Sequence, residues 1–246
     1  MTELGRPRES AAFLFSRDDA FHSLKLAGRQ VGILTRRVTM QQLNVLPRTA
    51  MAGEMVPENY FRKLGRHEVC RKDRALEVDL GCGDGSFLMA MAARYPERDF
   101  LGVERLLGRV RKVCKKITRR ELTNARVLRL DSRYVVEWLL PEASVSRLHL
   151  LCPDPWPKLR HHRRRLLQLD FLEAAWKSLV PGGEFLFMTD HEEYYAWAMN
   201  MMNRFGKFQR LEWDEHTFFY PKTDFQVQWE AEGKKMWRAR GIKASS

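Results

Sequence analysis

Between Ala75 and Thr189, short apolar runs of strand length alternate with amphipathic stretches of helix length. A chain with this rhythm buries its apolar residues by forming a mostly parallel sheet with helices on both faces. The sequence therefore predicts an α/β fold. The expected strands are Ala75–Leu80, Asp99–Glu104, Arg126–Leu130, Arg147–Cys152 and Glu184–Thr189.

Helices are expected between these strands, at about 86–95, 106–121, 133–140, 165–179 and 192–204. Pro181-Gly182-Gly183 is predicted to be a turn that ends one helix before the fifth strand begins. The tail, about 207–240, alternates aromatic and polar residues. It is expected to add an antiparallel pair at the edge of the sheet.

Charge is distributed unevenly along the chain. Lys and Arg number 43 against 31 Asp and Glu, and the net charge is +12. Residues 1–74 carry 14 of these cations and 8 of the acids but show no clear strand pattern. We interpret 1–74 as a basic N-terminal arm, which is partly helical around 10–30 or disordered at its tip, and 75–246 as the folded domain. The arm either contacts a polyanionic partner or is a solvated extension without a role.

Several classes of protein are disfavoured. No apolar run approaches the roughly 20 residues that a bilayer span requires, and the N-terminus lacks a signal-peptide pattern, so we expect a cytosolic protein without a membrane partner. The four cysteines form no CxxC pair, so they predict neither a disulfide framework nor a zinc site. His161 and His162 lack a third ligand, and we assign no metal.

A glycine turn follows the first strand of this pattern. Gly81, Gly83 and Gly85 have the spacing GxGxG, and Ser86 stands where the dinucleotide fingerprint GxGxxG requires its third glycine. The spacing resembles the S-adenosylmethionine loop of class I methyltransferases. The alternative is a tight strand-to-helix turn that binds nothing.

An acid ends each of the first three strands: Asp79, Glu104 and Asp131. The carboxyl ends of parallel strands meet in one crevice, where three carboxylates would repel one another unless a ligand supplies donors. S-adenosylmethionine offers an ammonium for Asp79, ribose hydroxyls for Glu104 and an adenine amino group for Asp131. The alternative is that these acids cap helices, which is strongest for Asp131. Glu77 is a rival to Asp79, because residues two apart on a strand share a face.

A proline-rich loop, residues 153–157, follows the fourth strand with the sequence Pro-Asp-Pro-Trp-Pro. Its alternating prolines predict an extended, stiff segment that holds Asp154 and Trp156 in place. A basic run, residues 158–165, comes next with five cations and no acid. Cations at a helix N-terminus oppose the macrodipole, so we expect Arg163, Arg164 and Arg165 to contact the phosphates of a polynucleotide. The alternative is a solvent-exposed basic start of a helix.

The string PDPWPK with its Arg/His run closely resembles the bacterial tRNA (guanine-N7)-methyltransferase family. Thr189-Asp190 and Thr223-x-x-Gln226 fall where that family carries Thr-Asp and Thr-x-x-Glu. The sequence departs from the family at Asp79, where Glu is frequent, and at Gln226, where an acid is usual.

The resemblance implies a class I methyltransferase fold and transfer of a methyl group from S-adenosylmethionine to N7 of a variable-loop guanine of tRNA. It implies that Asp154 is catalytic. The implied cofactor residues are Asp79, Gly81, Gly83, Glu104, Asp131, Ser132 and Asp154, and the implied substrate residues are Lys158, Asp190, Thr223 and Gln226.

Three other functions stay open. A class I methyltransferase with another acceptor, such as an exocyclic amine of a nucleic acid, would carry a similar proline loop. A non-catalytic RNA-binding module would retain the fold, although the three intact acids speak against it. A nicotinamide dehydrogenase is disfavoured, because Ser86 breaks its fingerprint and the crevice is acidic.

Overall fold

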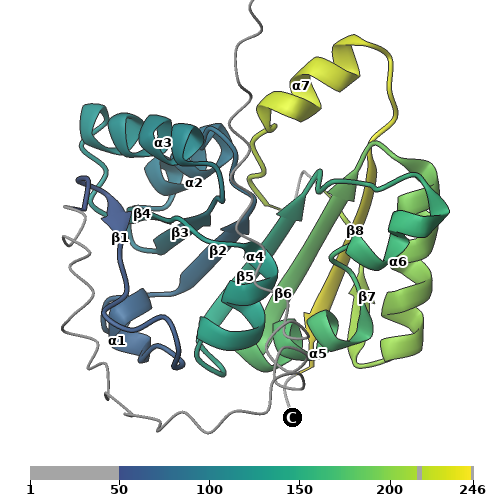
Figure 1. Cartoon of the computed structure of the whole chain (residues 1–246), viewed down its shortest axis with the longest axis horizontal. Helices are drawn as coiled ribbons and strands as arrows, with labels where there is room; N and C mark the ends of the chain where they lie inside the picture. The colour runs from purple at the N-terminus through teal and green to yellow at the C-terminus, as the bar shows by residue number, and fades with distance from the viewer. Residues whose placement is uncertain (1–49, 215–217, 245–246) are drawn as a thin grey trace, which may run out of the picture. The chain divides into compact units, whose positions relative to one another are not determined.

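The computed structural model describes residues 50–214 and 218–244, which form an eight-stranded sheet in the order β1-β4-β3-β2-β5-β6-β8-β7 (Figure 1). Strands β1 to β6 are parallel, and β8 runs antiparallel to both β6 and β7. The predicted mostly parallel α/β fold with an antiparallel edge is confirmed. The strands are β1 (Glu54–Met55), β2 (Leu76–Leu80), β3 (Asp99–Val103), β4 (Ala125–Leu128), β5 (Val145–Leu151), β6 (Leu179–Thr189), β7 (Phe208–Leu211) and β8 (Trp237–Lys243).

Helices cover both faces of the sheet (Figure 1). One apolar core holds residues of α2 and α3, and the other holds residues of α1, α5 and α6. The helices are α1 (Arg66–Val69), α2 (Ser86–Arg94), α3 (Leu107–Arg119), α4 (Ser132–Tyr134), α5 (Leu169–Ser178), α6 (Glu192–Phe205) and α7 (Asp224–Ala231). A π-helical turn (Val135–Leu139) continues α4, and a 3-10 helix (Leu159–Arg164) precedes α5.

Strand β2 fixes the position of the site. Its apolar residues Leu76, Val78 and Leu80 belong to the core that includes α5 and α6. Because side chains alternate along a strand, Glu77 and Asp79 point to the opposite face, toward α2 and α3. Chain order reverses at β2, which pairs with β3 on one side and β5 on the other. Ligands of open α/β sheets bind at such a switch point.

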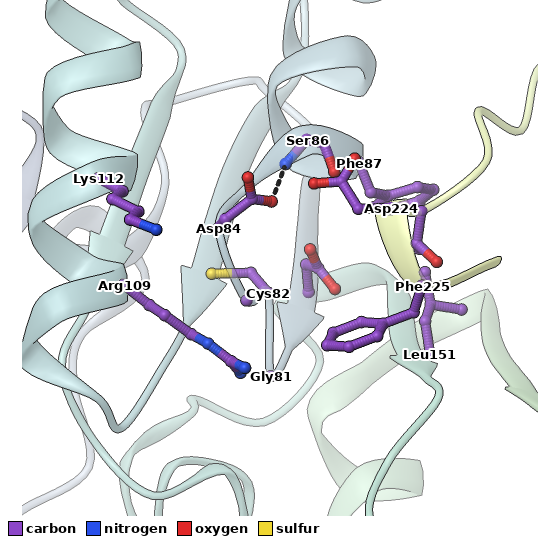
Figure 2. A pocket seen from close by; sticks show the side chains of 13 residues that line it. Gly81, Cys82, Asp84, Ser86, Phe87, Arg109, Lys112, Leu151, Asp224 and Phe225 are labelled. Carbon is purple, nitrogen blue, oxygen red and sulfur yellow. Dashed lines mark hydrogen bonds between the residues drawn. The ribbon is translucent and has the colours of Figure 1, made fainter. Parts of the chain in front are cut away.

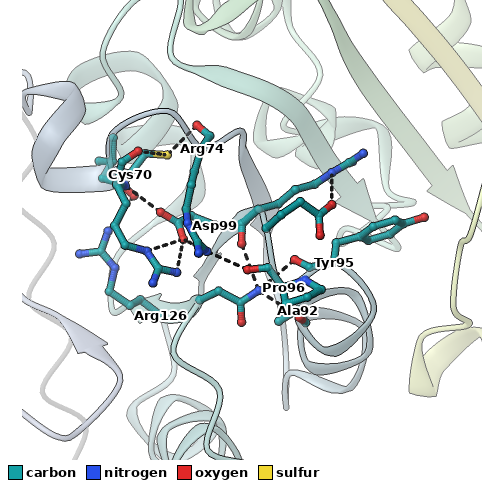
Figure 3. Close-up of polar contacts among 12 residues, drawn as sticks. Cys70, Arg74, Ala92, Tyr95, Pro96, Asp99 and Arg126 are labelled. Carbon is teal, nitrogen blue, oxygen red and sulfur yellow. Dashed lines mark hydrogen bonds and ion pairs between the residues drawn. The ribbon is translucent and has the colours of Figure 1, made fainter.

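Residues 50–74, which we assigned to the arm, contribute to this fold. The two residues of β1 pair with β4, and Met55, Leu64 and Val69 are buried in the core. Figure 3 shows the polar contacts that tie the following segment to the sheet: Asp99 accepts from the backbone N of Arg71 at 2.7 Å, and Arg74 donates to the carbonyl of Pro96 at 2.7 Å. The helix expected around 10–30 lies outside the described residues.

Three predicted boundaries are wrong. Pro181-Gly182-Gly183 lies inside β6 as a bulge, because Val145 pairs with Leu179 whereas Arg147 pairs with Glu184. The predicted helix 133–140 is mostly a π-helical turn. The predicted helix 165–179 begins at Leu169, and the preceding basic run forms the 3-10 helix. The basic residues therefore do not stand at the N-terminus of α5, and the macrodipole argument for them fails.

Within the described ranges, none of the helices combines the length and apolar character needed to cross a membrane. The cysteines carry free thiols, and Cys70, Cys82 and Cys114 are buried.

Candidate active site

The glycine turn, residues 81–85, connects β2 to α2 through backbone angles that favour glycine. Gly81, Gly83 and Gly85 have φ values of 76°, 58° and 83°. A Cβ on Gly81 would meet open space, whereas one on Gly85 would lie 2.9 Å from a methyl group of Val113 on α3. Gly81 and Gly83 thus leave room for a ligand, and Gly85 permits close packing of α3.

A pocket of about 240 Å³ opens beside this turn (Figure 2). It is lined by the end of β2, the start of α2, two cations of α3, the end of β5 and the start of α7. Phe225 of α7 lies close to the turn, with its ring 4.0 Å from the position of a Cβ on Gly83. The lining residues are Asp79, Gly81, Cys82, Gly83, Asp84, Ser86, Phe87, Arg109, Lys112, Leu151, Thr223, Asp224 and Phe225.

Asp79 lies at the floor of the pocket with 4% of its surface exposed. Burial and the nearby charge of Glu104 raise the pKa of its carboxyl to about 7. Among the described residues, no cation or hydrogen-bond donor pairs with this carboxyl. A buried acid without compensation is destabilising when ionised, so the site favours a ligand that brings positive charge.

Glu77, the rival to Asp79, has partners of its own. It lies 2.6 Å from Arg98 and 2.9 Å from Nε2 of His149, with Arg147 at 3.8 Å. Although burial opposes its ionisation, these neighbours hold the pKa of Glu77 at about 2. Burial lowers the pKa of His149, so the imidazole is neutral and donates to the carboxylate. Glu77 is thus a structural ion pair, and Asp79 is the acid of the pocket.

The other two strand-end acids differ in their surroundings. Glu104 is buried, accepts from the backbone N of Leu106 at 2.8 Å and lies 3.7 Å from Arg109. Asp131 is exposed and caps α4, because one of its oxygens accepts from the backbone of Arg133 and Tyr134 at 3.0 and 3.2 Å. One carboxyl oxygen of Asp131 therefore makes the predicted helix cap. The predicted cofactor residues Glu104, Asp131 and Ser132, the first residue of α4, are not among the residues that line the pocket.

The mouth of the pocket carries charged residues that the sequence analysis missed. Asp84 pairs with Lys116 of α3 and shares a hydrogen bond with Asp224, the first residue of α7. This shared bond raises the pKa of Asp224. Thr223 caps α7 by accepting from the backbone N of Gln226 at 3.0 Å. The position of Asp84 between two glycines could have marked it as a site residue. No local sequence pattern indicates that α7 packs beside the glycine turn.

The proline loop is bent where we predicted an extended segment. Cys152 and Trp156 have φ values of 52° and 45°, in the left-handed region. Asp154 is exposed and does not line the pocket. The guanidinium of Arg164 lies 4.9 Å from the centre of the Trp156 ring, so this tryptophan braces the basic run.

Arg165 is fully buried, which contradicts its predicted role as an RNA contact. Its guanidinium donates to the carbonyl of Pro155 at 2.9 Å and to Glu193 of α6 at 2.9 Å. Arg165 therefore anchors the proline loop to α6 and leaves no donor face for phosphate. Lys158, Arg163 and Arg164 are exposed.

The predicted substrate residues gather in part. Asp190 and Thr223 both lie close to Cys152. The charge of Asp190 raises the pKa of the Cys152 thiol, and a hydrogen bond with the side chain of Thr223 lowers it. Gln226 is 1% exposed, its amide donates to Glu230 at 2.7 Å, and its carbonyl oxygen has no partner among the described residues. A buried acceptor without a donor is costly unless a ligand supplies one.

Comparisons with known proteins identify the family of this chain. A family model described as a putative methyltransferase matches residues 73–239. The tRNA (guanine-N(7)-)-methyltransferase of Chromohalobacter salexigens is 35% identical over 212 residues, which cover 85% of this chain and 82% of that protein. The enzyme of the same name from Syntrophotalea carbinolica is 39% identical over 119 residues, which are 48% of this chain and about half, 51%, of that relative.

Among solved structures, the 16S rRNA methyltransferase KamB matches with a TM-score of 0.57 at 17% identity, over 79% of this chain and 99% of that chain. That likeness concerns the fold alone. The relatives and the family model together confirm the resemblance carried by the proline loop: the chain belongs to the tRNA (guanine-N7)-methyltransferase family.

Proposed function

We propose that this protein transfers a methyl group from S-adenosylmethionine to N7 of a guanine in the variable loop of tRNA, in the cytosol. The observation that carries this proposal is the uncompensated carboxyl of Asp79 at the floor of a glycine-walled pocket. A cationic methyl donor satisfies that carboxyl, whereas a diphosphate cofactor would be repelled by it.

The residues present fit the donor. Asp79 would hold its ammonium, and Glu104 its ribose hydroxyls. The second oxygen of Asp131, which is not used in capping α4, is available to the adenine amino group. Gly81 and Gly83 would let the amino-acid part approach the backbone. When bound, the donor supplies an electrophilic methyl group on a sulfonium.

Guanine N7 has a lone pair and no proton, so its attack on the sulfonium methyl group would need no general base. The bond from sulfur to the methyl group would break, and neutral S-adenosylhomocysteine would leave. Alignment of the reactants supplies most of the acceleration, for which well-oriented groups gain as much as roughly 7–11 kcal/mol. The purine would become cationic during transfer, and the carboxylate of Asp154, which is exposed in the loop before the basic run, would stabilise that charge more than it stabilises the neutral base. Asp190, Thr223, Gln226 and Lys158 would hold the guanine nucleotide, and Arg163 and Arg164 would contact tRNA phosphates.

The role of Asp154 predicts a specific loss in Asp154→Asn. We expect kcat to fall by roughly 10²-fold, the scale on which one electrostatic stabiliser acts. Binding of S-adenosylhomocysteine, measured by calorimetry, serves as the control for an intact pocket. Full turnover of Asp154→Asn would exclude this role.

The proposed reaction is tested with unmodified tRNA transcripts and labelled cofactor. One transcript carries the variable-loop guanine, and its matched partner carries adenine there. We expect label only in the first, recovered after digestion as 7-methylguanosine. Label in a methylated adenosine or an exocyclic amine would support the alternative acceptor. Donor binding without any transfer to tRNA would support the non-catalytic module.

A further inference from the structure

Helix α3 (Leu107–Arg119) carries an uncompensated positive surface. It is continued by Arg120, and no acid occurs between Leu107 and Arg120. Two of its cations are paired, Arg109 with Glu104 and Lys116 with Asp84. Five more are exposed and have no ion-pair partner within the described ranges: Arg111, Lys112, Lys115, Arg119 and Arg120.

The sequence of α3 is unfavourable for an isolated helix. Arg111, Lys115 and Arg119 follow one another at intervals of four residues, and like charges at this spacing repel across each turn. The macrodipole favours cations only in the last turn, so it offsets the cost at Arg119 but not at Arg111. The apolar side of α3 packs into the core through Val110, Val113 and Ile117, which fixes the cationic side outward.

A groove runs along this cationic side. It is lined by the apolar residues Met51, Ala52 and Cys114, by Thr118, and by the cations Arg111, Lys115 and Arg119. An α-helix rises about 1.5 Å per residue, so these three cations are spread over about 12 Å. A row of cations beside apolar side chains suits a nucleic-acid strand, because its phosphates contact the charges while a base or sugar covers the apolar side chains.

The cationic side of α3 also adjoins the methyl-donor pocket. Arg109 and Lys112 extend from α3 toward the glycine turn, and both line the pocket (Figure 2). A strand that passes over α3 would therefore lead toward the place where the methyl group is transferred.

We propose that the outer face of α3, formed by Arg111, Lys115 and Arg119, is a second docking surface that binds the phosphate backbone of tRNA, separate from the basic run 158–165. This proposal rests on the proposed function for the identity of its RNA. The alternative occupant of the groove is residues 1–49 of this chain. These residues carry eight Lys or Arg against four Asp or Glu, so their net charge is positive like that of α3. Charge repulsion therefore disfavours them as the occupant.

The test compares the parent protein with a variant that combines Arg111→Gln, Lys115→Gln and Arg119→Gln. A matched control combines Lys177→Gln, Arg204→Gln and Arg210→Gln, which removes the same charge from exposed residues of α5, α6 and β7. A second control, Arg111→Lys with Arg119→Lys, keeps the charge on α3. Affinity for an unmodified tRNA transcript is measured by fluorescence anisotropy at several salt concentrations, and affinity for S-adenosylhomocysteine by calorimetry.

We expect the α3 variant to bind tRNA more weakly, with the slope of log affinity against log salt flattened by about 1 for each phosphate contact removed. S-adenosylhomocysteine binding should be unchanged, and both controls should keep the parent slope. Parental affinity and slope in the α3 variant would overturn the proposal. Unchanged tRNA binding with faster proteolysis before residue 50 would also overturn it and assign the groove to residues 1–49.

These experiments can refute the docking surface and the proposed reaction independently of each other. Parental RNA binding by the α3 variant, in a protein that methylates tRNA, would overturn the docking surface and leave the proposed reaction intact. Weakened RNA binding by the α3 variant, in a protein that methylates no tRNA, would support the docking surface and overturn the reaction.

Discussion

Two carboxyl groups on β2 show how one strand serves stability and ligand binding at once. Glu77 and Asp79 are two residues apart, point to the same face and are both buried. Glu77 is surrounded by Arg98, Arg147 and His149, which hold its pKa at about 2. Asp79 has no cationic partner among the described residues, and burial together with the nearby charge of Glu104 raises its pKa to about 7.

The difference shows which of two similar acids belongs to a functional site. A buried charge that the protein has already neutralised contributes to the fold, and its removal leaves opposite charges without a partner. A buried charge that the protein has left without a partner costs stability until a ligand arrives. Spacing from Gly81 favours Asp79, and the surroundings of the two acids give the physical reason.

The largest effect on stability is expected for Glu77→Gln. This change leaves Arg98 without its charged, buried acceptor, whereas Arg147 keeps its hydrogen bond to Glu184 at 3.2 Å. Breaking a buried charge pair costs about 3–5 kcal/mol. Arg98 is a third exposed, so solvent screening places the expected loss at the lower end of that range. Urea unfolding of parent and variant measures the loss. A variant as stable as the parent would mean that Glu77 is not held by these cations.

In contrast to Glu77→Gln, Asp79→Asn is expected to stabilise the folded protein. The unfolded carboxyl ionises near pH 4, whereas the folded one ionises at about pH 7. The contribution of Asp79 to stability therefore falls as the pH rises from 4 through 7, and the amide removes this penalty. We expect the free energy of unfolding at pH 8 to rise by on the order of 1–3 kcal/mol. Destabilisation at pH 8 that persists in a second variant, Asp79→Ser, would contradict the account.

A smaller effect is expected from pH on donor binding. Below about pH 7 the free pocket holds Asp79 protonated, and a proton must leave before an ammonium is bound. Affinity for S-adenosylhomocysteine should therefore fall roughly tenfold between pH 8 and pH 6, one pKa unit on either side of the midpoint. Calorimetry across this range provides the values, and Asp79→Asn serves as the control with a flat profile. If the parent's affinity for S-adenosylhomocysteine did not change with pH, Asp79 would not differ from Glu77 in its ionisation.

Regular, local features of the fold were predictable from the sequence. The buried parallel strands are short apolar runs in the sequence. The five predicted strands between Ala75 and Thr189 therefore correspond to β2 through β6, with differences only at their ends. The acid before the glycine turn was predictable because its position follows from chain order alone. Its lack of a partner was not, since that depends on where Arg98 and Glu104 lie in space.

Other features depend on contacts between distant segments. The two residues of β1 form a strand only because β4 offers them an edge. Arg165 looks like its exposed neighbours in the sequence, and only the approach of Glu193 on α6 explains its burial. The return of α7 over the pocket places Thr223 and Phe225 beside glycines roughly 140 residues earlier, a distance that no local pattern reports.

The most direct test of the account measures whether Asp79 acts through the ammonium of the donor. Calorimetry would compare S-adenosylhomocysteine with 5′-methylthioadenosine, which lacks the amino-acid part, on the parent and on Asp79→Asn. We predict that the substitution weakens S-adenosylhomocysteine by roughly 30-fold or more, as expected for one partner of a buried charge pair, and leaves 5′-methylthioadenosine nearly unchanged. An equal loss for both ligands, or no loss for either, would contradict the claim.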